Sequence, residues 1–236
     1  MSKPAKNPAK IQTMFSSIAP RYDLLNRLLS LGRDRYWRQF AVSRLPKKQA
    51  SQFLDVATGT GDVAVEIIKQ HGPDTRITGI DFSEGMLELG KKKISDLGYQ
   101  QLIDLRRGDV TSLDFEDEVF DAAIIAFGIR NVPDYKKSIM EMARVIKKGG
   151  RVVILEFTSM QSRFFQWIFR LYLEKILPFL GGLISGRKTA YKYLSDSVMD
   201  FPPPEEFKKI MLDSGLKEVE YHRLTFSIVT VHVGIK

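Results

Sequence analysis

Short apolar segments alternate with amphipathic helical patterns over most of this chain after Pro46. The runs QFLDVA, RITGID, IDLRRGD, FDAAIIAFG and RVVILEF are separated by stretches whose apolar residues recur at helical spacing. Strands joined by helices of this length form right-handed crossovers, so the order predicts an α/β fold with a doubly wound, mostly parallel sheet. Ligands of such a sheet bind at the carboxyl ends of its strands.

Two further alternating runs, KEVEYHRLT and FSIVTVHVGIK, close the chain and bring the predicted strands to seven. Almost nothing separates them, which predicts an antiparallel hairpin at one edge of the sheet. A plain dinucleotide-binding domain does not end in this way. Residues 11–45 instead show helical patterns interrupted at Pro20 and Gly32, which predicts an N-terminal helical segment or lid in front of the sheet.

Residues 160–200 interrupt the alternation with an aromatic-rich helical pattern, which predicts a helical insertion on the substrate side. At 236 residues the chain is long enough for one sizeable domain, which we expect over residues 11–236. The lysine- and proline-rich residues 1–10 lack an apolar core, so they predict a disordered tail rather than a signal peptide, and we expect a cytoplasmic protein.

Charge and cysteine content limit the classes of function. The formal net charge of +8 suits an acidic partner: nucleic acid, a phosphate-bearing cofactor or the anionic face of a membrane. The chain has no cysteine, which excludes disulfides, thiolate metal sites and a cysteine nucleophile. No grouping of histidine, aspartate and glutamate at metal-ligand spacing stands out, so we expect no metal. Structural roles are expected for the histidines, His71, His222 and His232.

A glycine-rich turn follows the first apolar run in the sequence FLDVATGTGD. Gly59, Gly61 and Ala64 fit the pattern G-x-G-x-x-G/A, and Asp81 lies near the distance expected of a ribose-binding acid. Glycines let the backbone approach a ligand closely, and an acid at the end of the second strand accepts hydrogen bonds from ribose hydroxyls. The turn predicts an adenosine cofactor without saying which one.

Two more acids favour S-adenosyl-L-methionine over a dinucleotide. Asp55 stands just before the glycines, where a carboxylate suits a cationic amino group and repels a pyrophosphate. Asp109 ends the third strand, where it can reach the adenine amino group while Val110 donates its backbone N–H to the ring. Each acid also has a structural alternative, because Asp55 can cap the turn and Asp109 can form an Asx turn. The candidate cofactor-binding residues are Asp55, Ala57, Gly59, Thr60, Gly61, Asp81, Phe82, Asp109, Val110 and Ala126.

The methyl acceptor is not expected to be nucleic acid. An adenine N6 enzyme would carry an Asn/Asp-Pro-Pro-aromatic tetrad after the fourth strand, where this chain has AFGIRN. Cytosine C5 chemistry needs a cysteine nucleophile, which is absent. Both observations weaken a nucleic acid as the substrate.

Five segments of the chain are more distinctive than the glycine turn: IAPRYDLLNRLLSLGRDRYW from Ile18, IAFGIRNVPD from Ile125, ARVIKKGGRVVILEFT from Ala143, YKYLSDSVMDFP from Tyr191 and the closing TVHVGIK. Together they resemble the ubiquinone/menaquinone biosynthesis C-methyltransferase family, whose fold is that of class I methyltransferases. The resemblance covers nearly the whole chain. It departs from the family pattern at Asp34, Lys148 and Thr158, where the family usually has histidine, proline and serine.

The resemblance implies methylation of a ring carbon of a polyprenylated hydroquinone. The main substrate implied is demethylmenaquinol, with a ubiquinone precursor as an additional one. It places Arg130, Asn131, Tyr22 and Asp23 near that substrate. Arginine stays protonated at neutral pH, so Arg130 would stabilise a phenolate or orient a water. Alternatively, Arg130 is a surface residue that pairs with Asp134, and Tyr22 and Asp23 only begin a helix packed on the sheet.

The insertion raises the question of membrane contact. The pattern from Arg163 to Gly182 has a narrow polar stripe and a proline, which leaves no apolar span near the roughly 20 residues that cross a bilayer. It either packs under the N-terminal helices or lines an entrance for an isoprenoid tail at the inner face of the membrane.

Remaining alternatives for the function are a methyltransferase of another small molecule, an NAD-dependent oxidoreductase or a basic binding module. The ring, the tail length and the oligomeric state stay open, with a homodimer among the arrangements considered.

Overall fold

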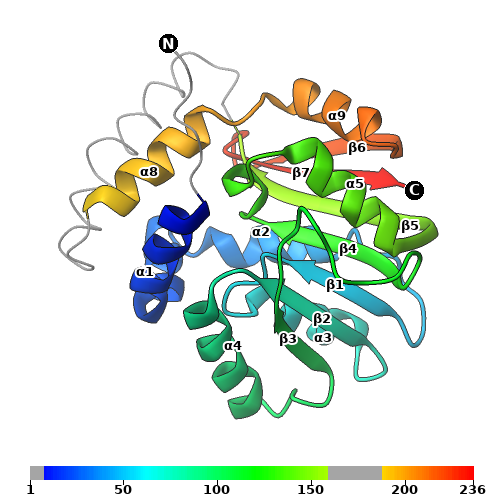
Figure 1. The fold of residues 1–236 in the computed structure, drawn as a ribbon, viewed down its shortest axis with the longest axis horizontal. Coiled ribbons are helices and arrows are strands. Elements are labelled where there is room, and N and C mark those ends of the chain that lie inside the picture. The colour runs from blue at the N-terminus through cyan, green and yellow to red at the C-terminus, as the bar shows by residue number, and fades with distance from the viewer. Residues whose placement is uncertain (1–7, 159–187) are drawn as a thin grey trace.

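A computed structural model describes residues 8–158 and 188–236. Its centre is a seven-stranded sheet in the order β3-β2-β1-β4-β5-β7-β6, as Figure 1 shows. The pairs β1–β2, β2–β3, β1–β4 and β4–β5 are parallel, and the two pairs that involve β7 are antiparallel. The strands are β1 (Gln52–Val56), β2 (Arg76–Asp81), β3 (Ile103–Arg107), β4 (Phe120–Ala126), β5 (Ile146–Phe157), β6 (Lys217–Leu224) and β7 (Val229–Ile235). The predicted doubly wound sheet with its terminal hairpin is confirmed.

Helices cover both faces of this sheet. One apolar core joins α2, α3 and α4 to residues such as Phe53 and Val153, and the other joins α5 and α9 to residues such as Leu54 and Ile154. Alternate residues of β1 therefore enter opposite cores, which explains why the strands of a parallel sheet are continuous apolar runs. The helices are α1 (Pro8–Leu29), α2 (Arg33–Val42), α3 (Asp62–His71), α4 (Glu84–Asp96), η1 (Ile129–Asn131), α5 (Tyr135–Val145), α8 (Lys188–Met199) and α9 (Pro204–Asp213).

The N-terminal segment differs from the sequence prediction in two respects. Helix α1 continues through Pro20 and ends before Gly32, whose φ of 76° places it in the left-handed region. Proline removes one helical hydrogen bond. Side-chain hydrogen bonds on both sides of Pro20, between Ser16 and Ser83 and from Thr60 to Asp23, keep the helix continuous. The helix also begins at Pro8, inside the tail that was expected to reach residue 10.

Only the end of the predicted insertion belongs to the described residues, where α8 packs against η1. The aromatic-rich helix expected from Arg163 lies outside them. Among the described helices, none has the length and apolar character required to cross a bilayer.

The strand order reverses between β1 and β4, since the chain runs outward to β3 and then returns to the other side of β1. A crevice forms at such a reversal because neighbouring connections leave in opposite directions. The loops after β1, β2, β3 and β4 meet there, and α1 lies across them in Figure 1.

Candidate functional site

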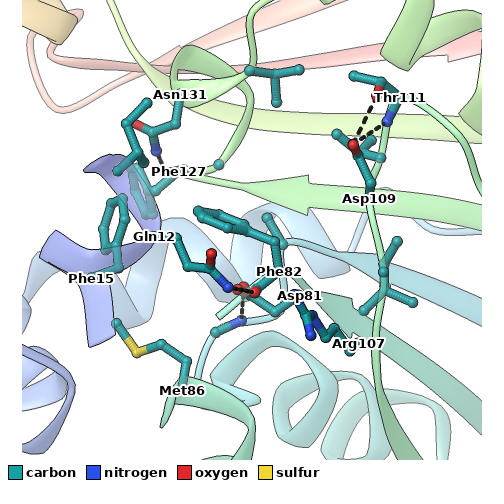
Figure 2. A pocket seen from close by; sticks show the side chains of 18 of the residues that line it. Gln12, Phe15, Asp81, Phe82, Met86, Arg107, Asp109, Thr111, Phe127 and Asn131 are labelled. Atoms are coloured by element: carbon teal, nitrogen blue, oxygen red, sulfur yellow. Dashed lines mark hydrogen bonds between the residues drawn. The ribbon is translucent and has the colours of Figure 1, made fainter. Parts of the chain in front are cut away.

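A cavity of about 590 Å³ lies at the carboxyl ends of the first four strands and beneath α1. Its walls come from segments far apart in the sequence, as Figure 2 shows. They are Ile11, Gln12, Phe15, Tyr22, Ala57, Gly59, Ile80, Asp81, Phe82, Met86, Arg107, Gly108, Asp109, Val110, Thr111, Ala126, Phe127, Gly128, Asn131, Val132 and Pro133.

The glycine-rich turn is held against the end of β2 by Asp81. One carboxylate oxygen of Asp81 accepts the N–H of Gly59 at 2.9 Å, and the other accepts the N–H of Ser83 at 2.8 Å. Burial raises the pKa of Asp81, and these backbone N–H groups oppose the rise. Gly59 has a φ of 58°, and a side chain there would meet open space. The turn therefore presents bare backbone to the cavity beside a buried acid.

The turns after β1 and β4 approach each other closely at Gly128. A Cβ atom at Gly128 would lie 2.6 Å from the Cβ of Ala57, so glycine is required there. Ala57 and Phe127 both have positive φ, 52° and 57°. Such backbone strain in residues other than glycine concentrates at functional sites.

Asp109 lies in the cavity wall and also forms the Asx turn that is its structural alternative. Its Oδ1 accepts the N–H of Thr111 at 2.8 Å and the hydroxyl of Thr111 at 2.9 Å. Both bonds go to the same oxygen, and in the part of the chain that the structure describes no hydrogen bond reaches Oδ2, so that oxygen can accept from an external donor. The Asx turn and a binding role are therefore compatible.

Three candidate cofactor residues, Asp55, Thr60 and Gly61, do not line the cavity. Asp55 is 1% exposed and accepts the hydroxyl of Thr58 at 2.5 Å, which is the turn-capping alternative. Burial raises its pKa to about 7, although the Thr58 bond and a backbone contact with Ala64 act in the opposite direction. The other candidates, Ala57, Gly59, Asp81, Phe82, Asp109, Val110 and Ala126, do line it.

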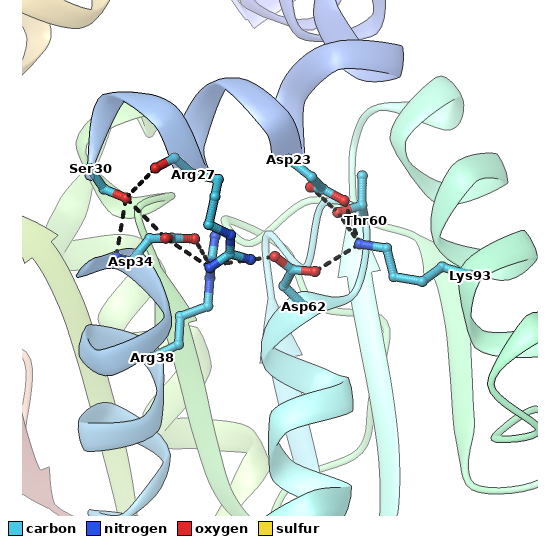
Figure 3. A network of polar contacts seen from close by, with 8 residues as sticks. All are labelled: Asp23, Arg27, Ser30, Asp34, Arg38, Thr60, Asp62 and Lys93. Atoms are coloured by element: carbon cyan, nitrogen blue, oxygen red, sulfur yellow. Dashed lines mark hydrogen bonds and ion pairs between the residues drawn. The ribbon is translucent and has the colours of Figure 1, made fainter. Parts of the chain in front are cut away.

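Asp23 lies in a polar network beside the cavity rather than in its wall. It accepts the hydroxyl of Thr60 at 2.7 Å and pairs with Lys93 at 2.5 Å, and Lys93 also pairs with Asp62 at 2.7 Å. Figure 3 shows how these contacts join α1 to α3 and α4. The network consists of Asp23, Arg27, Ser30, Asp34, Arg38, Thr60, Asp62 and Lys93.

Arg130 lies behind the cavity wall and is 5% exposed. Its guanidinium donates to Glu156 Oε1 at 2.7 Å and to the carbonyl oxygen of Phe127 at 2.6 Å. The alternative that it pairs at the surface with Asp134 is wrong, because Asp134 instead caps α5 by accepting the N–H of Lys137. The phenolate-stabilising role stays a prediction.

Tyr22 and Asn131 both line the cavity, on α1 and η1 respectively. Burial raises the pKa of Tyr22, so its hydroxyl stays protonated at neutral pH. Gln12 and Phe15 also line the cavity from the same helix as Tyr22, and neither was among the predicted site residues. Gln12 donates to the carbonyl oxygen of Phe82 at 2.6 Å. The spacing of Ile11, Phe15 and Tyr22 along one helical face was the available signal.

No group of three or more histidine, aspartate and glutamate side chains suited to hold a metal ion occurs within residues 8–158 and 188–236.

Comparison with known proteins agrees with this geometry over the whole chain. The model of the ubiE/COQ5 methyltransferase family matches residues 3–236. The chain belongs to the ubiE/COQ5 methyltransferase family. It is 48% identical over 236 residues, all of both chains, to the ubiquinone/menaquinone biosynthesis C-methyltransferase UbiE of Geotalea daltonii. It is 46% identical over 221 residues to the demethylmenaquinone methyltransferase of Thermus thermophilus, which covers 94% of this chain and 99% of that one.

The fold of this methyltransferase is shared with distant solved structures. An S-adenosylmethionine-dependent methyltransferase of Aquifex aeolicus superposes with a TM-score of 0.62 at 17% identity, over 90% of this chain and 97% of the other. The cofactor of the methyltransferase is S-adenosyl-L-methionine, as the glycine turn and its acids predicted.

The residues of the cavity fit this cofactor. Asp81 and Asp109 supply carboxylate oxygens at the ends of β2 and β3, where ribose hydroxyls and an adenine amino group need acceptors. Gly59 offers backbone without a side chain and has open space beside it for a ligand. At Gly128, in contrast, the Ala57 side chain already fills that space. Asp81, Asp109 and the Gly59 turn would hold the nucleoside.

Proposed function

We propose that this methyltransferase adds a methyl group to a ring carbon of a polyprenylated hydroquinone. Its main substrate is demethylmenaquinol, and a ubiquinone precursor is a second substrate. The two curated relatives described above support the substrate class by their names. The structural observation that carries the proposal is the division of one cavity into two ends. Asp109 and Arg107 lie on one side in Figure 2, and Phe15, Phe127 and Asn131 lie on the other.

The aromatic end suits a flat ring with two oxygen substituents. Phe15 and Phe127 offer apolar faces, while Tyr22 and Asn131 offer a hydroxyl and an amide. Aromatic rings pack favourably on one another, and polar groups in an otherwise apolar pocket fix the orientation of a ligand.

When bound, S-adenosyl-L-methionine supplies an electrophilic methyl group on its sulfonium. The chain must then orient the ring carbon and favour the ionised hydroquinone oxygen, which pushes electron density onto the adjacent carbon. The protonated hydroxyl of Tyr22 and the amide N–H of Asn131 are donors suited to that oxygen. Arg130 acts indirectly in this proposal, because its bonds to Glu156 and Phe127 hold the loop that carries Asn131.

Helix α1 serves as the lid of the cavity. It contributes Gln12, Phe15 and Tyr22 to the walls, and it reaches the cofactor loops through the bonds from Gln12 to Phe82 and between Ser16 and Ser83. The helix would shield the aromatic end from water, which would strengthen the electrostatic contacts there.

Transfer of label from methyl-labelled S-adenosylmethionine tests the function. Demethylmenaquinol, its oxidised quinone and a desmethyl benzoquinol are offered in parallel. We expect label in the reduced naphthoquinol and none in the oxidised quinone, because the quinone ring is electrophilic. Label in both reduced rings would show activity in both pathways. Absence of label from every ring, with S-adenosylhomocysteine still bound, would refute the proposal.

We also propose that the outer side of the N-terminal helices contacts the membrane that holds the substrate, at its cytoplasmic face. Leu24, Leu28 and Leu31 are 55%, 48% and 89% exposed, and exposed Arg33 and Arg35 follow them. Apolar side chains beside basic ones match the surface of a bilayer with anionic headgroups.

Sedimentation with vesicles tests the membrane contact. We expect binding to vesicles that contain phosphatidylglycerol and weaker binding to pure phosphatidylcholine. Leu28→Gln with Leu31→Gln should reduce binding, whereas Leu97→Gln, at an exposed leucine on α4's end, should not. Equal binding by both variants would exclude this surface.

A further inference from the structure

The hydroxyl of Tyr193 donates to the side-chain oxygen Oδ1 of Asn131 at 3.1 Å. Tyr193 belongs to α8, and Asn131 belongs to η1 after β4, so 62 residues of sequence separate the two. Asn131 lines the cavity and Tyr193 does not. The bond therefore joins the wall of the site to a helix behind it.

The neighbours of Asn131 determine the orientation of its side-chain amide, that is, which partner faces Oδ1 and which faces Nδ2. The carbonyl oxygen of Phe127 lies 3.5 Å from Nδ2 and can only accept a hydrogen bond, so the nitrogen must face it. The amide oxygen must then face Tyr193. The amide has two N–H groups, and within residues 8–158 and 188–236 a partner is present for the one that faces Phe127, which leaves the other.

We propose that Tyr193 is a positioning residue that fixes the Asn131 amide so that its remaining N–H is available to an oxygen of the hydroquinone ring. This inference rests on the proposed function. Donation by Tyr193 to the amide oxygen also polarises the amide and makes that N–H a stronger donor. The ring oxygen carries its greatest negative charge in the ionised hydroquinone and passes part of it to the ring carbon as that carbon attacks, so the N–H helps by stabilising the ionised form from which the attack starts.

The hydroxyl of Tyr193 remains a donor at neutral pH. Burial raises its pKa, and nearby Glu156 acts in the same direction while Arg130 opposes both. Without the hydroxyl, the Asn131 side chain would keep, of its hydrogen bonds to the described residues, the long one with Phe127, and its amide would rotate more freely.

The variant Tyr193→Phe removes only the hydroxyl. We expect kcat for demethylmenaquinol to fall about threefold to tenfold, the loss of one hydrogen bond, with an unchanged Kd for S-adenosylhomocysteine. Asn131→Ala should lose more activity, and adding Tyr193→Phe to it should have no further effect. Tyr221→Phe is the matched control, since it also removes a tyrosine hydroxyl. Tyr221 lies on β6, and its hydroxyl donates to Glu205 on α9 rather than to a residue of the cavity.

A second measurement needs no substrate and separates this inference from the proposed function. The side-chain amide signal of Asn131 in a nitrogen-15 correlation spectrum, assigned by its loss in Asn131→Ala, should shift in Tyr193→Phe and stay in place in Tyr221→Phe. An unmoved signal would overturn the inference. So would an unchanged kcat, or equal losses from Tyr193→Phe with and without Asn131. Failure of the wild-type chain to methylate any quinol would refute the proposed function alone.

Discussion

Arg130 and Glu156 form an ion pair of 2.7 Å in which the side chains are 5% and 0% exposed. Glu156 also accepts the backbone N–H groups of Arg130 and Phe157, at 3.2 and 2.8 Å. The last residues of β5 thereby hold the loop after β4 from behind. Arg130, which the family resemblance places near the substrate, is thus bound to a carboxylate from a different strand.

Removing one partner of this pair should destabilise the fold strongly. Arg130→Met leaves the Glu156 carboxylate buried without a cation, and we expect a loss of about 3–5 kcal/mol in the free energy of unfolding. Urea denaturation measures it. The double variant Arg130→Met with Glu156→Leu should recover much of the loss, because no buried charge remains. Equal stability of the two variants would contradict a coupled pair.

The pKa of Asp55 gives the chain a specific dependence of stability on pH. The folded value of about 7 exceeds an unfolded value of about 4, so the folded state binds the proton more tightly. The contribution of Asp55 is complete below about pH 4 and is lost as the pH rises to about 7, at up to about 1.4 kcal/mol per pH unit.

Asp55→Asn tests this dependence because asparagine does not titrate and keeps an oxygen for Thr58. The free energy of unfolding should fall less between pH 4 and 7 in the variant than in the wild type. Denaturant titrations across that interval measure the difference. Parallel curves for the two proteins would show that folding does not raise the pKa of Asp55.

Asp81 should contribute to cofactor affinity through its charge. Asp81→Asn keeps one acceptor for the backbone N–H of Gly59 or Ser83 but loses a charged acceptor for ribose. We expect the Kd for S-adenosylhomocysteine to rise about tenfold to a hundredfold, measured by calorimetry. Asp104→Asn, at an exposed residue of β3, is the control and should bind normally. Normal binding by a folded Asp81→Asn variant would remove Asp81 from the cofactor site.

Lys93 should hold the α1 lid through its pairs with Asp23 and Asp62. Lys93→Met removes both pairs, and we expect S-adenosylhomocysteine to dissociate about threefold faster, since partly exposed pairs contribute up to about 1 kcal/mol. Stopped-flow fluorescence measures the rate. High salt should speed dissociation from the wild type and have less effect on the variant.

The neighbouring variant Lys92→Met provides the control for this prediction, because Lys92 is exposed on the same helix. It carries the same change of charge without the pairs to Asp23 and Asp62. An equal acceleration in both variants would assign the effect to net charge rather than to the lid.

The sequence by itself determined the fold and the cofactor turn, because both depend on local patterns. Strand and helix periodicity predicted the sheet, and the acid at the end of β2, Asp81, follows the glycine turn at a characteristic distance. Substrate class came from resemblance rather than from spacing. Asp55 could not be assigned from its position, since capping a turn and facing a ligand place an acid at the same point in the sequence.

Only the tertiary structure decided which polar residues meet. Arg130 pairs with Glu156, Asp23 with Lys93 and Asn131 with Tyr193, across separations of 26, 70 and 62 residues. Periodicity tells which face of an element is buried but not which elements become neighbours, so it cannot identify partners of this kind. Charged and polar groups settle where burial leaves them an available partner, and that partner is fixed by the packing of the whole sheet and its helices.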